Sequence, residues 1–137
     1  MATIRHEISI DVDPKHVWAA LRDIGAVHER LLPEYVVDTR IDGDVRFLTM
    51  PGGNVIRELI VTIDDEARRL AYSAVEGFQL PLTHHHASFQ VLATDNGRST
   101  LVWVTDVLPH DAADQVRPRV ERGAQVIKTT IEQHHPA

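Results

Sequence analysis

Hydrophobic and polar residues alternate in short runs along the first 108 positions of the chain, and alternation with a period of two predicts β-strands. The first run covers residues 3–12, where Ile4, Ile8 and Ile10 are apolar. Six further runs follow, at residues 35–41, 45–50, 54–63, 69–75, 84–93 and 99–108. The breaks that contain glycine are short enough for hairpins, so neighbouring strands are expected to pair antiparallel.

Two short helices are predicted between the first strand and the second. Asp13 can accept a hydrogen bond from the amides of a first helical turn, and Pro14 suits the first helical position. Apolar residues then recur at helical spacing as far as about residue 22. Residues 26–32 offer one or two further turns before Pro33 excludes continuation.

After Pro109 the apolar period changes from two to between three and four, which predicts a long helix over residues 112–134. Pro118 falls in its first two turns, where few intrahelical bonds are at stake. The apolar positions of this helix are Val116, Val120, Ala124, Ile127 and Ile131. The pattern as a whole predicts one α+β domain over residues 1–137, in which a curved seven-stranded antiparallel sheet wraps around the last helix.

The composition limits the chemistry that the chain can perform. It has no cysteine, which excludes a disulfide framework, a thiolate metal site and a cysteine nucleophile. Its net charge is −6 and its 14 Lys and Arg residues are scattered, so nucleic acid is not an expected partner. No P-loop, dinucleotide fingerprint, Ser-His-Asp order or metalloprotease motif is present, so we expect no cofactor, and any catalysis would use acid–base groups.

The N-terminal residues lack the basic start and the long apolar run of a signal peptide, and no apolar stretch approaches the ~20 residues that span a bilayer. We therefore expect a cytoplasmic protein without membrane insertion, as a monomer or a homodimer.

Several stretches carry a resemblance to a known superfamily. The first is Asp13-Pro14 followed by residues 17–23. The second is a longer block that contains residues 57–59, 64–65, 69–72 and 75–77. With the order of elements, they resemble the helix-grip (START/birch-pollen-allergen-like, SRPBCC) superfamily, in particular its polyketide cyclase/dehydrase and lipid-transport group. The resemblance spans essentially the whole chain and implies a cavity between the concave face of the sheet and the last helix.

The same block is locally similar to the plant abscisic acid receptors, and Pro51-Gly52-Gly53 sits where those receptors carry a gate loop. Two departures limit this similarity. No lysine lies on residues 36–41, where the receptors hold a carboxylate, and Leu31-Leu32-Pro33 lacks the tryptophan of many bacterial members. The hormone is therefore not an expected ligand.

Glu58 is the first candidate for orienting a ligand, because it matches the pocket glutamate of the receptors. If it faces the cavity, Ile56 and Ile60 would partly desolvate its carboxyl and raise its pKa. The alternative is a solvated position on the outer face, since Leu59 and Val61 make the opposite face equally apolar.

Tyr72 and His85 are the other candidates for polar or catalytic roles. Tyr72 matches an aromatic pocket position of the family, although it could equally be a core tyrosine. His84-His85-His86 invites a metal hypothesis, but adjacent strand residues face opposite sides, so only His84 and His86 share a side, and we expect no metal site. His85 is expected to face inward.

The remaining wall of the cavity is expected to be apolar. Trp103 should face inward, since it alternates with Leu101 and Thr105 along one strand. Ala124 and Ile127 should close the cavity from the last helix, where Gly123 and Ala124 leave room for a ligand.

These residues support three functional hypotheses. The first is binding or carrying a small hydrophobic molecule, such as a lipid, a polyketide or an aromatic metabolite. The second is a polyketide cyclase or dehydratase in which Glu58, Tyr72 or His85 moves protons. The third is an interaction module gated by the loop at 51–53. Binding requires only a cavity and is the first choice; the sequence does not identify the ligand.

Overall fold

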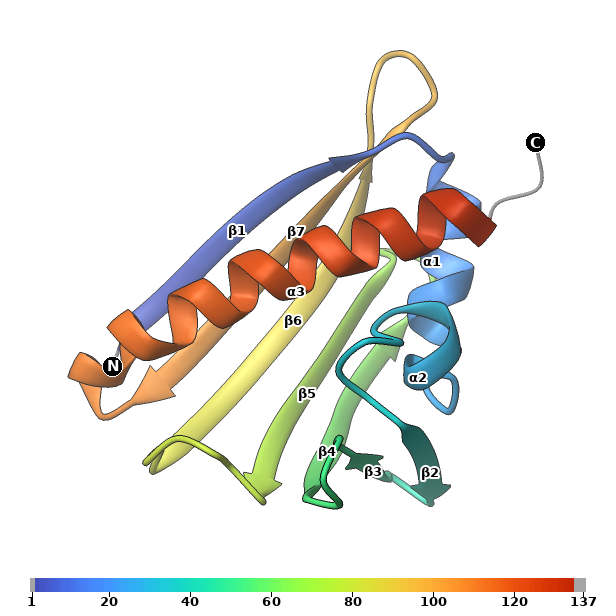
Figure 1. The fold of residues 1–137 in the computed structure, drawn as a ribbon. Helices are drawn as coiled ribbons and strands as arrows, with labels where there is room; N and C mark the ends of the chain where they lie inside the picture. Colours follow the sequence, from blue (N-terminus) through green and yellow to red (C-terminus); the bar gives the residue numbers. More distant parts are fainter. Residues whose placement is uncertain (1, 135–137) are drawn as a thin grey trace.

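Seven strands form one antiparallel sheet in the order β1-β7-β6-β5-β4-β3-β2 in the computed structural model, which describes residues 2–134 (Figure 1). The strands are β1 (Ala2–Ile10), β2 (Asp38–Asp42), β3 (Val45–Thr49), β4 (Val55–Asp64), β5 (Arg69–Glu76), β6 (His84–Ala93) and β7 (Ser99–Leu108). Strands β2 to β7 form a meander, and β1 pairs with β7 at the far edge. The predicted α+β class and seven-stranded sheet are confirmed.

Helices lie against one face of this sheet (Figure 1). They are α1 (Pro14–Arg22), α2 (Val27–Arg30), a 3-10 turn η1 (His110–Ala112) and α3 (Ala113–His134). Asp13 caps α1 as expected, since its side chain accepts from the backbone N–H of His16. Helix α3 crosses the sheet diagonally, and Pro118 falls in its first two turns, as the sequence indicated. None of the helices in residues 2–134 is long and apolar enough to cross a membrane.

The second strand begins later than the apolar pattern predicts. The sequence places its start at Tyr35, but β2 starts at Asp38. The backbone N–H groups of Tyr35 and Val36 both donate to the carbonyl of Leu32, at 3.1 and 2.9 Å. These bonds form a turn after α2, so the N–H groups of Tyr35 and Val36 are not available to the β-ladder, and the first contact with β3 is the bond from the Val37 N–H to the Thr49 carbonyl.

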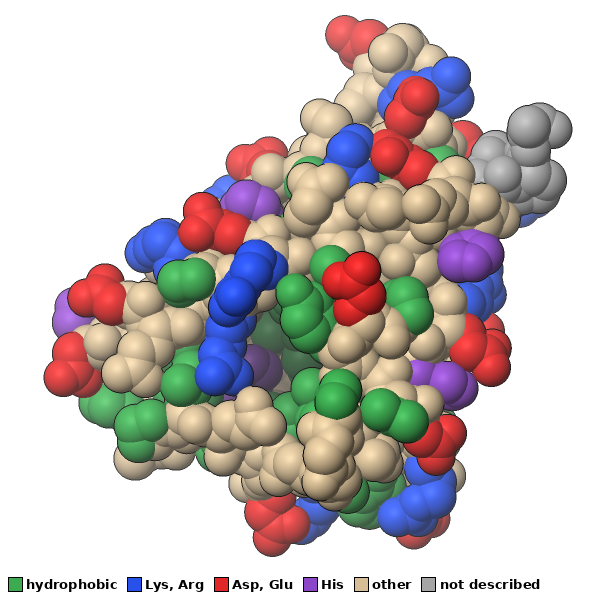
Figure 2. Space-filling view, in the orientation of Figure 1, with side chains coloured by type: hydrophobic (Ala, Val, Ile, Leu, Met, Phe, Trp, Pro, Cys, Tyr) green, Lys and Arg blue, Asp and Glu red, His purple; other side chains and the backbone are tan. Residues whose placement is uncertain are grey.

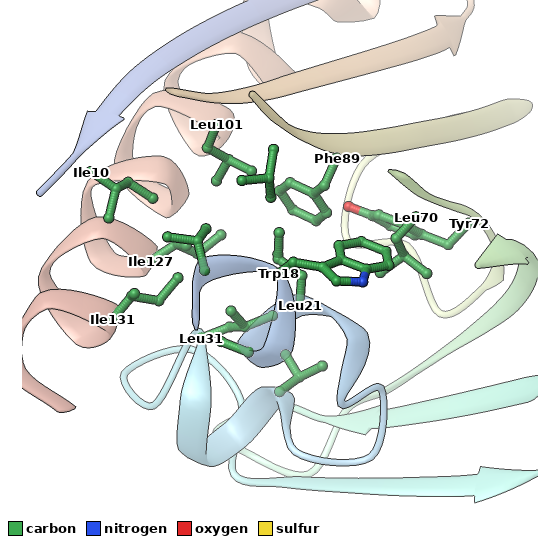
Figure 3. Close-up of a cluster of buried hydrophobic side chains, with 14 of the residues drawn as sticks. Ile10, Trp18, Leu21, Leu31, Leu70, Tyr72, Phe89, Leu101, Ile127 and Ile131 are labelled. Atoms are coloured by element: carbon green, nitrogen blue, oxygen red, sulfur yellow. The ribbon is translucent and has the colours of Figure 1, made fainter. Parts of the chain in front are cut away.

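Buried apolar side chains form two clusters under α3. The larger one joins α1, the sheet and the C-terminal half of α3, and includes Leu21, Phe89 and Ile127 (Figure 3). The smaller one includes Ile4, Val107, Val116 and Val120, at the other end of α3. Trp103 packs against both clusters. It therefore lies at the boundary between the two packed ends of the molecule.

The close approach between the end of β5 and the start of β4 requires the glycine that follows β5. Gly77 has φ +86°, and a Cβ at this position would lie 2.1 Å from the carbonyl oxygen of Val55. The Gly77 carbonyl also accepts a hydrogen bond from the Asn54 side chain at 3.0 Å. Only glycine allows this approach of the two strand ends.

Gly77→Ala should therefore cost about 3 kcal/mol or more of unfolding free energy, as the sum of a left-handed backbone and an overpacked contact. Gly43→Ala is the matched control, because Gly43 also has positive φ, +62°, but nothing within 4 Å of an added Cβ. It should cost about 1 kcal/mol. Urea unfolding followed by circular dichroism measures both, and equal losses would contradict the close approach at Gly77.

Candidate functional site

A cavity of about 190 Å³ opens between the concave face of the sheet and the N-terminal half of α3. The connection between β5 and β6 borders it through Phe78, Gln79, Leu80 and Leu82. Strands β4 to β7 contribute Ile56, Glu58, Tyr72, Ala74, His85, Trp103 and Thr105, and α3 contributes Val116, Arg119 and Val120. Figure 2 shows a hollow on this face of the molecule, with hydrophobic side chains around it and basic side chains along one rim.

The sheet brings together four of the six residues proposed from the sequence to bind a ligand. Glu58, Tyr72, His85 and Trp103 all line the cavity. Ile127 instead lines a smaller space of about 50 Å³, which shares Glu58, Tyr72 and Trp103 with the first. The three candidates for proton transfer, Glu58, Tyr72 and His85, thus face one space.

Ala124 was expected to close the cavity, but it is fully buried and lies outside the lining of both spaces. The reason is the position of Trp103, whose ring lies 3.1 Å from where a Cβ of Gly123 would be. The indole occupies the room that the sequence analysis assigned to a ligand beside Gly123. The helical wall of the cavity therefore comes from Val116, Arg119 and Val120, nearer the start of α3.

Glu58 faces the cavity, but its carboxylate is not isolated. Arg46 lies directly opposite on β3, and its Nε and Nη2 contact Oε1 of Glu58 at 2.8 and 2.7 Å. The two side chains are only 4% and 7% exposed. Both contacts use the same oxygen, so Oε2 has no hydrogen-bond partner in the described part of the chain. A carboxylate oxygen in the cavity wall can accept a hydrogen bond from a ligand.

Sequence reasoning missed Arg46, although a signal was present. Arg46 shares a strand face with Leu48, and the β3–β4 hairpin, whose loop contains Pro51-Gly52-Gly53, sets it across from Glu58. Opposite charges in register on neighbouring strands form a cross-strand pair. The sequence-based prediction treated the Glu58 carboxyl as isolated and desolvated, whereas Arg46 provides it with a counterion.

Tyr72 presents its hydroxyl to the same space. Its ring stacks on Phe89, with centroids 5.9 Å apart, and is tilted against His85 at 5.8 Å. Burial, and then the negative charge of Glu58, raise the pKa of the phenol, so it stays protonated at neutral pH. The indole N–H of Trp103 lies near enough to lower this pKa slightly, but it does not reach hydrogen-bond geometry.

His85 lies at the point where β5 and β6 separate. The last backbone pair between these strands is Tyr72 with Ala87. Beyond it, the N–H of Ala74 donates to Nδ1 of His85 at 3.0 Å, and the Ser73 hydroxyl donates to the His85 carbonyl. The imidazole thus replaces a backbone acceptor, which satisfies the ladder while leaving the strands apart.

The protonation state of His85 follows from this contact. Burial first, and then the neighbouring charges of His86 and His84, lower its pKa to about 4. At neutral pH the ring is uncharged, and because Nδ1 accepts from Ala74, the proton sits on Nε2. Nε2 has no hydrogen-bond partner within residues 2–134, so it is a donor available to a ligand.

Two further polar atoms of the wall have no partner in the part of the chain that the structure describes. Trp103 Nε1 and Thr105 Oγ1 are buried without a hydrogen bond to any described residue. Each such group costs about 1–3 kcal/mol when it is left unpaired. Thr105 was not proposed as a site residue, although its alternation with Leu101 and Trp103 already placed it on the inner face.

The comparisons with known proteins match this architecture. The family model described as polyketide cyclase/dehydrase and lipid transport matches residues 1–132. The chain belongs to this family. No protein of curated function matches it at a significant level.

Solved structures share the fold of this family member. The protein XoxI from Bacillus cereus is 22% identical, with a TM-score of 0.81 over 97% of this chain and 94% of that chain. A protein from Thermobifida fusca is 24% identical, with a TM-score of 0.77 over 96% and 91%. Norcoclaurine synthase from Thalictrum flavum, in complex with dopamine and hydroxybenzaldehyde, is 22% identical, with a TM-score of 0.72 over 98% and 88%.

Other features singled out from the sequence lie away from the cavity of this family member. His84 is exposed, and His86 lies on the convex face beside Ser88 and Asp106. Among residues 2–134 there is no group of three or more His, Asp or Glu side chains that could hold a metal ion. The loop at 51–53 is exposed and does not border the cavity.

The buried pair gives a stability prediction. Glu58→Gln should destabilise the protein by about 3–5 kcal/mol, because it leaves the Arg46 charge buried without its counterion. Replacing both residues, Arg46→Met with Glu58→Leu, should cost less than either single change, since no uncompensated charge remains. Chemical denaturation of the wild type, Arg46→Met, Glu58→Leu and the double variant measures the coupling, and additive losses would contradict the ion pair.

His85 gives a pH prediction. Its pKa rises from about 4 in the folded protein to the ordinary 6.5 on unfolding, so the unfolded chain binds more protons between these values. Stability should be full above pH 6.5 and fall by about 3 kcal/mol as the pH drops to 4.

His85→Asn should remove most of this slope, because the Asn side-chain oxygen can still accept from Ala74 but does not titrate. His84→Asn, at the exposed neighbouring position, is the control and should retain it. The unfolding free energy of each variant at a series of pH values provides the measurement. An unchanged slope in His85→Asn would overturn the assignment of a buried neutral imidazole.

Proposed function

We propose that this protein binds a small, mostly apolar molecule of about one substituted ring in the cavity between the sheet and α3. The observation that carries the proposal is an apolar wall interrupted by polar atoms that have no hydrogen-bond partner among residues 2–134. The family and the fold support a ligand-binding or cyclase-like role.

The volume of the cavity favours a small ligand. Drug-sized ligands occupy pockets of about 300–1,000 Å³, whereas an apolar cavity of about 150 Å³ is enough for benzene. At about 190 Å³, this cavity suits one ring with a few substituent atoms. A long acyl chain or a fused polycyclic polyketide would require α3 or the connection before β6 to move.

The polar atoms favour a ligand with oxygen substituents. Trp103 Nε1 and His85 Nε2 can donate, and Oε2 of Glu58 can accept. A hydroxyl group both donates and accepts, so it can pair with Glu58 and with one of the donors at once. Such pairing would recover the desolvation cost of groups that the described residues leave unpaired.

Proton transfer is the second candidate function, and its requirements fit the site less well. A general base must be free to accept a proton from the substrate. Glu58 is held by Arg46, and Nδ1 of His85 is occupied by the Ala74 N–H. The protonated Tyr72 hydroxyl and Nε2–H of His85 could polarise a carbonyl, which is the contribution that a cyclase would take from these residues.

Binding of 4-methylphenol and toluene, measured by titration calorimetry, tests the proposal. These probes share ring size and differ in one hydroxyl group. We expect 4-methylphenol to bind at least about tenfold more tightly, since one hydrogen bond to a charged group contributes about 1.5–3 kcal/mol. Equal affinities would contradict a role for the polar atoms.

Ala74→Phe places a ring inside the cavity and should abolish this binding. Ala19→Phe, the same change at an exposed position of α1, is the control and should bind like the wild type. Because an added ring can strain the fold, unfolding curves should accompany both variants. Retained binding in a folded Ala74→Phe protein would place the phenol elsewhere and overturn the proposal.

A further inference from the structure

The charges of the side chains that line the cavity do not sum to zero. The ionisable side chains with access to the cavity are Glu58, His85, Tyr72 and Arg119. His85 and Tyr72 are uncharged at neutral pH, and the charge of Glu58 is compensated by Arg46. Arg119 therefore leaves the cavity with one positive charge, although the chain as a whole carries −6.

Arg119 has no acidic partner among the described residues, and its place on α3 explains why. The residues three and four positions away, which are its neighbours on the helix surface, are Gln115, Val116, Arg122 and Gly123. None of them is acidic. Arg117, two positions earlier, instead has Asp114 and Glu121 at these spacings.

Arg119 is exposed, while its neighbours Val116 and Val120 are buried in the cavity wall. Its guanidinium group therefore belongs to the rim, above the apolar interior, and Gln79 adds an amide donor from the connection before β6. Figure 2 shows basic side chains along this rim of the hollow. A ligand that places its ring inside would bring any group attached to the outer end of the ring close to Arg119.

We propose that the ligand of this cavity is a small ring-containing carboxylic acid, whose carboxylate binds Arg119 at the rim while the ring occupies the apolar interior. This inference rests on the binding function proposed above and specifies the ligand class. The planar guanidinium fork matches a carboxylate in a bidentate arrangement. A phosphate monoester, with a charge close to −2, would call for further cations in the lining. Among the described residues that line the cavity, Arg119 is the one cation.

Two probes test this inference: 4-hydroxyphenylacetate and its uncharged analogue 4-hydroxyphenylacetamide. They have the same ring and hydroxyl group, so their affinity ratio isolates the contribution of the carboxylate charge. In titration calorimetry at pH 7.5 and low salt, we expect the wild type to bind the acid about tenfold more tightly than the amide. The ratio should shrink as salt is added, since the rim is exposed to solvent.

Arg119→Gln should bring the ratio close to one by weakening the acid alone. Arg117→Gln removes the same charge from the same helix, away from the cavity lining, and should leave the ratio unchanged. Both positions are exposed, so both variants are expected to fold.

The outcomes separate this inference from the function on which it rests. If both probes bind the wild type equally, or the amide binds more tightly, the carboxylate inference is overturned while ring binding stands. If the preference for the acid survives in Arg119→Gln, Arg119 is not the anion partner and the inference is also overturned. If neither probe nor 4-methylphenol binds, the proposed function itself fails.

Discussion

The contact between the Trp103 ring and Gly123 sets how α3 lies over the sheet, and the cavity depends on it. A side chain as large as tryptophan on the concave face would force the helix away from the strands if the opposing residue carried a Cβ. Glycine allows the ring to lie directly under the helix. On one side of this contact the space is packed by the cluster around Phe89 and Ile127, and on the other side it stays open. One aromatic residue thus separates the structural core from the site.

The open side is maintained by polar contacts that a purely apolar core would not need. The separation of β5 and β6 leaves the N–H of Ala74 without a backbone acceptor, and the His85 side chain supplies one. The Arg46–Glu58 pair sits on the neighbouring strands, where two charges compensate each other out of water. A buried ion pair seldom adds net stability, so the proposed contact with a ligand, and not folding energy, accounts for its place in the wall.

The electrostatic character of the site changes from its interior to its rim. Inside, the ionisable groups are either neutral or paired, and the remaining polar atoms offer single hydrogen bonds to a ligand. At the rim, Arg119 adds a charge that no neighbour on the helix compensates. A cavity of this kind combines apolar burial, which supplies affinity, with a few directed polar groups, which fix orientation. It is the arrangement expected of a site that holds a small molecule in one pose.

Local patterns in the sequence determined the elements of this protein. Period-two alternation marked the strands, the change of period after Pro109 marked α3, and Asp13 marked the start of α1, because each signal depends only on neighbouring residues. The same alternation predicted that His85 and Trp103 face inward, whereas Tyr72 was proposed from the resemblance to the family. Only the tertiary structure decided what faces them, because that depends on register and on the depth of the helix over the sheet. The partner of Glu58 came from the register of a hairpin, and the exclusion of Ala124 from the cavity wall came from one indole ring packed against Gly123.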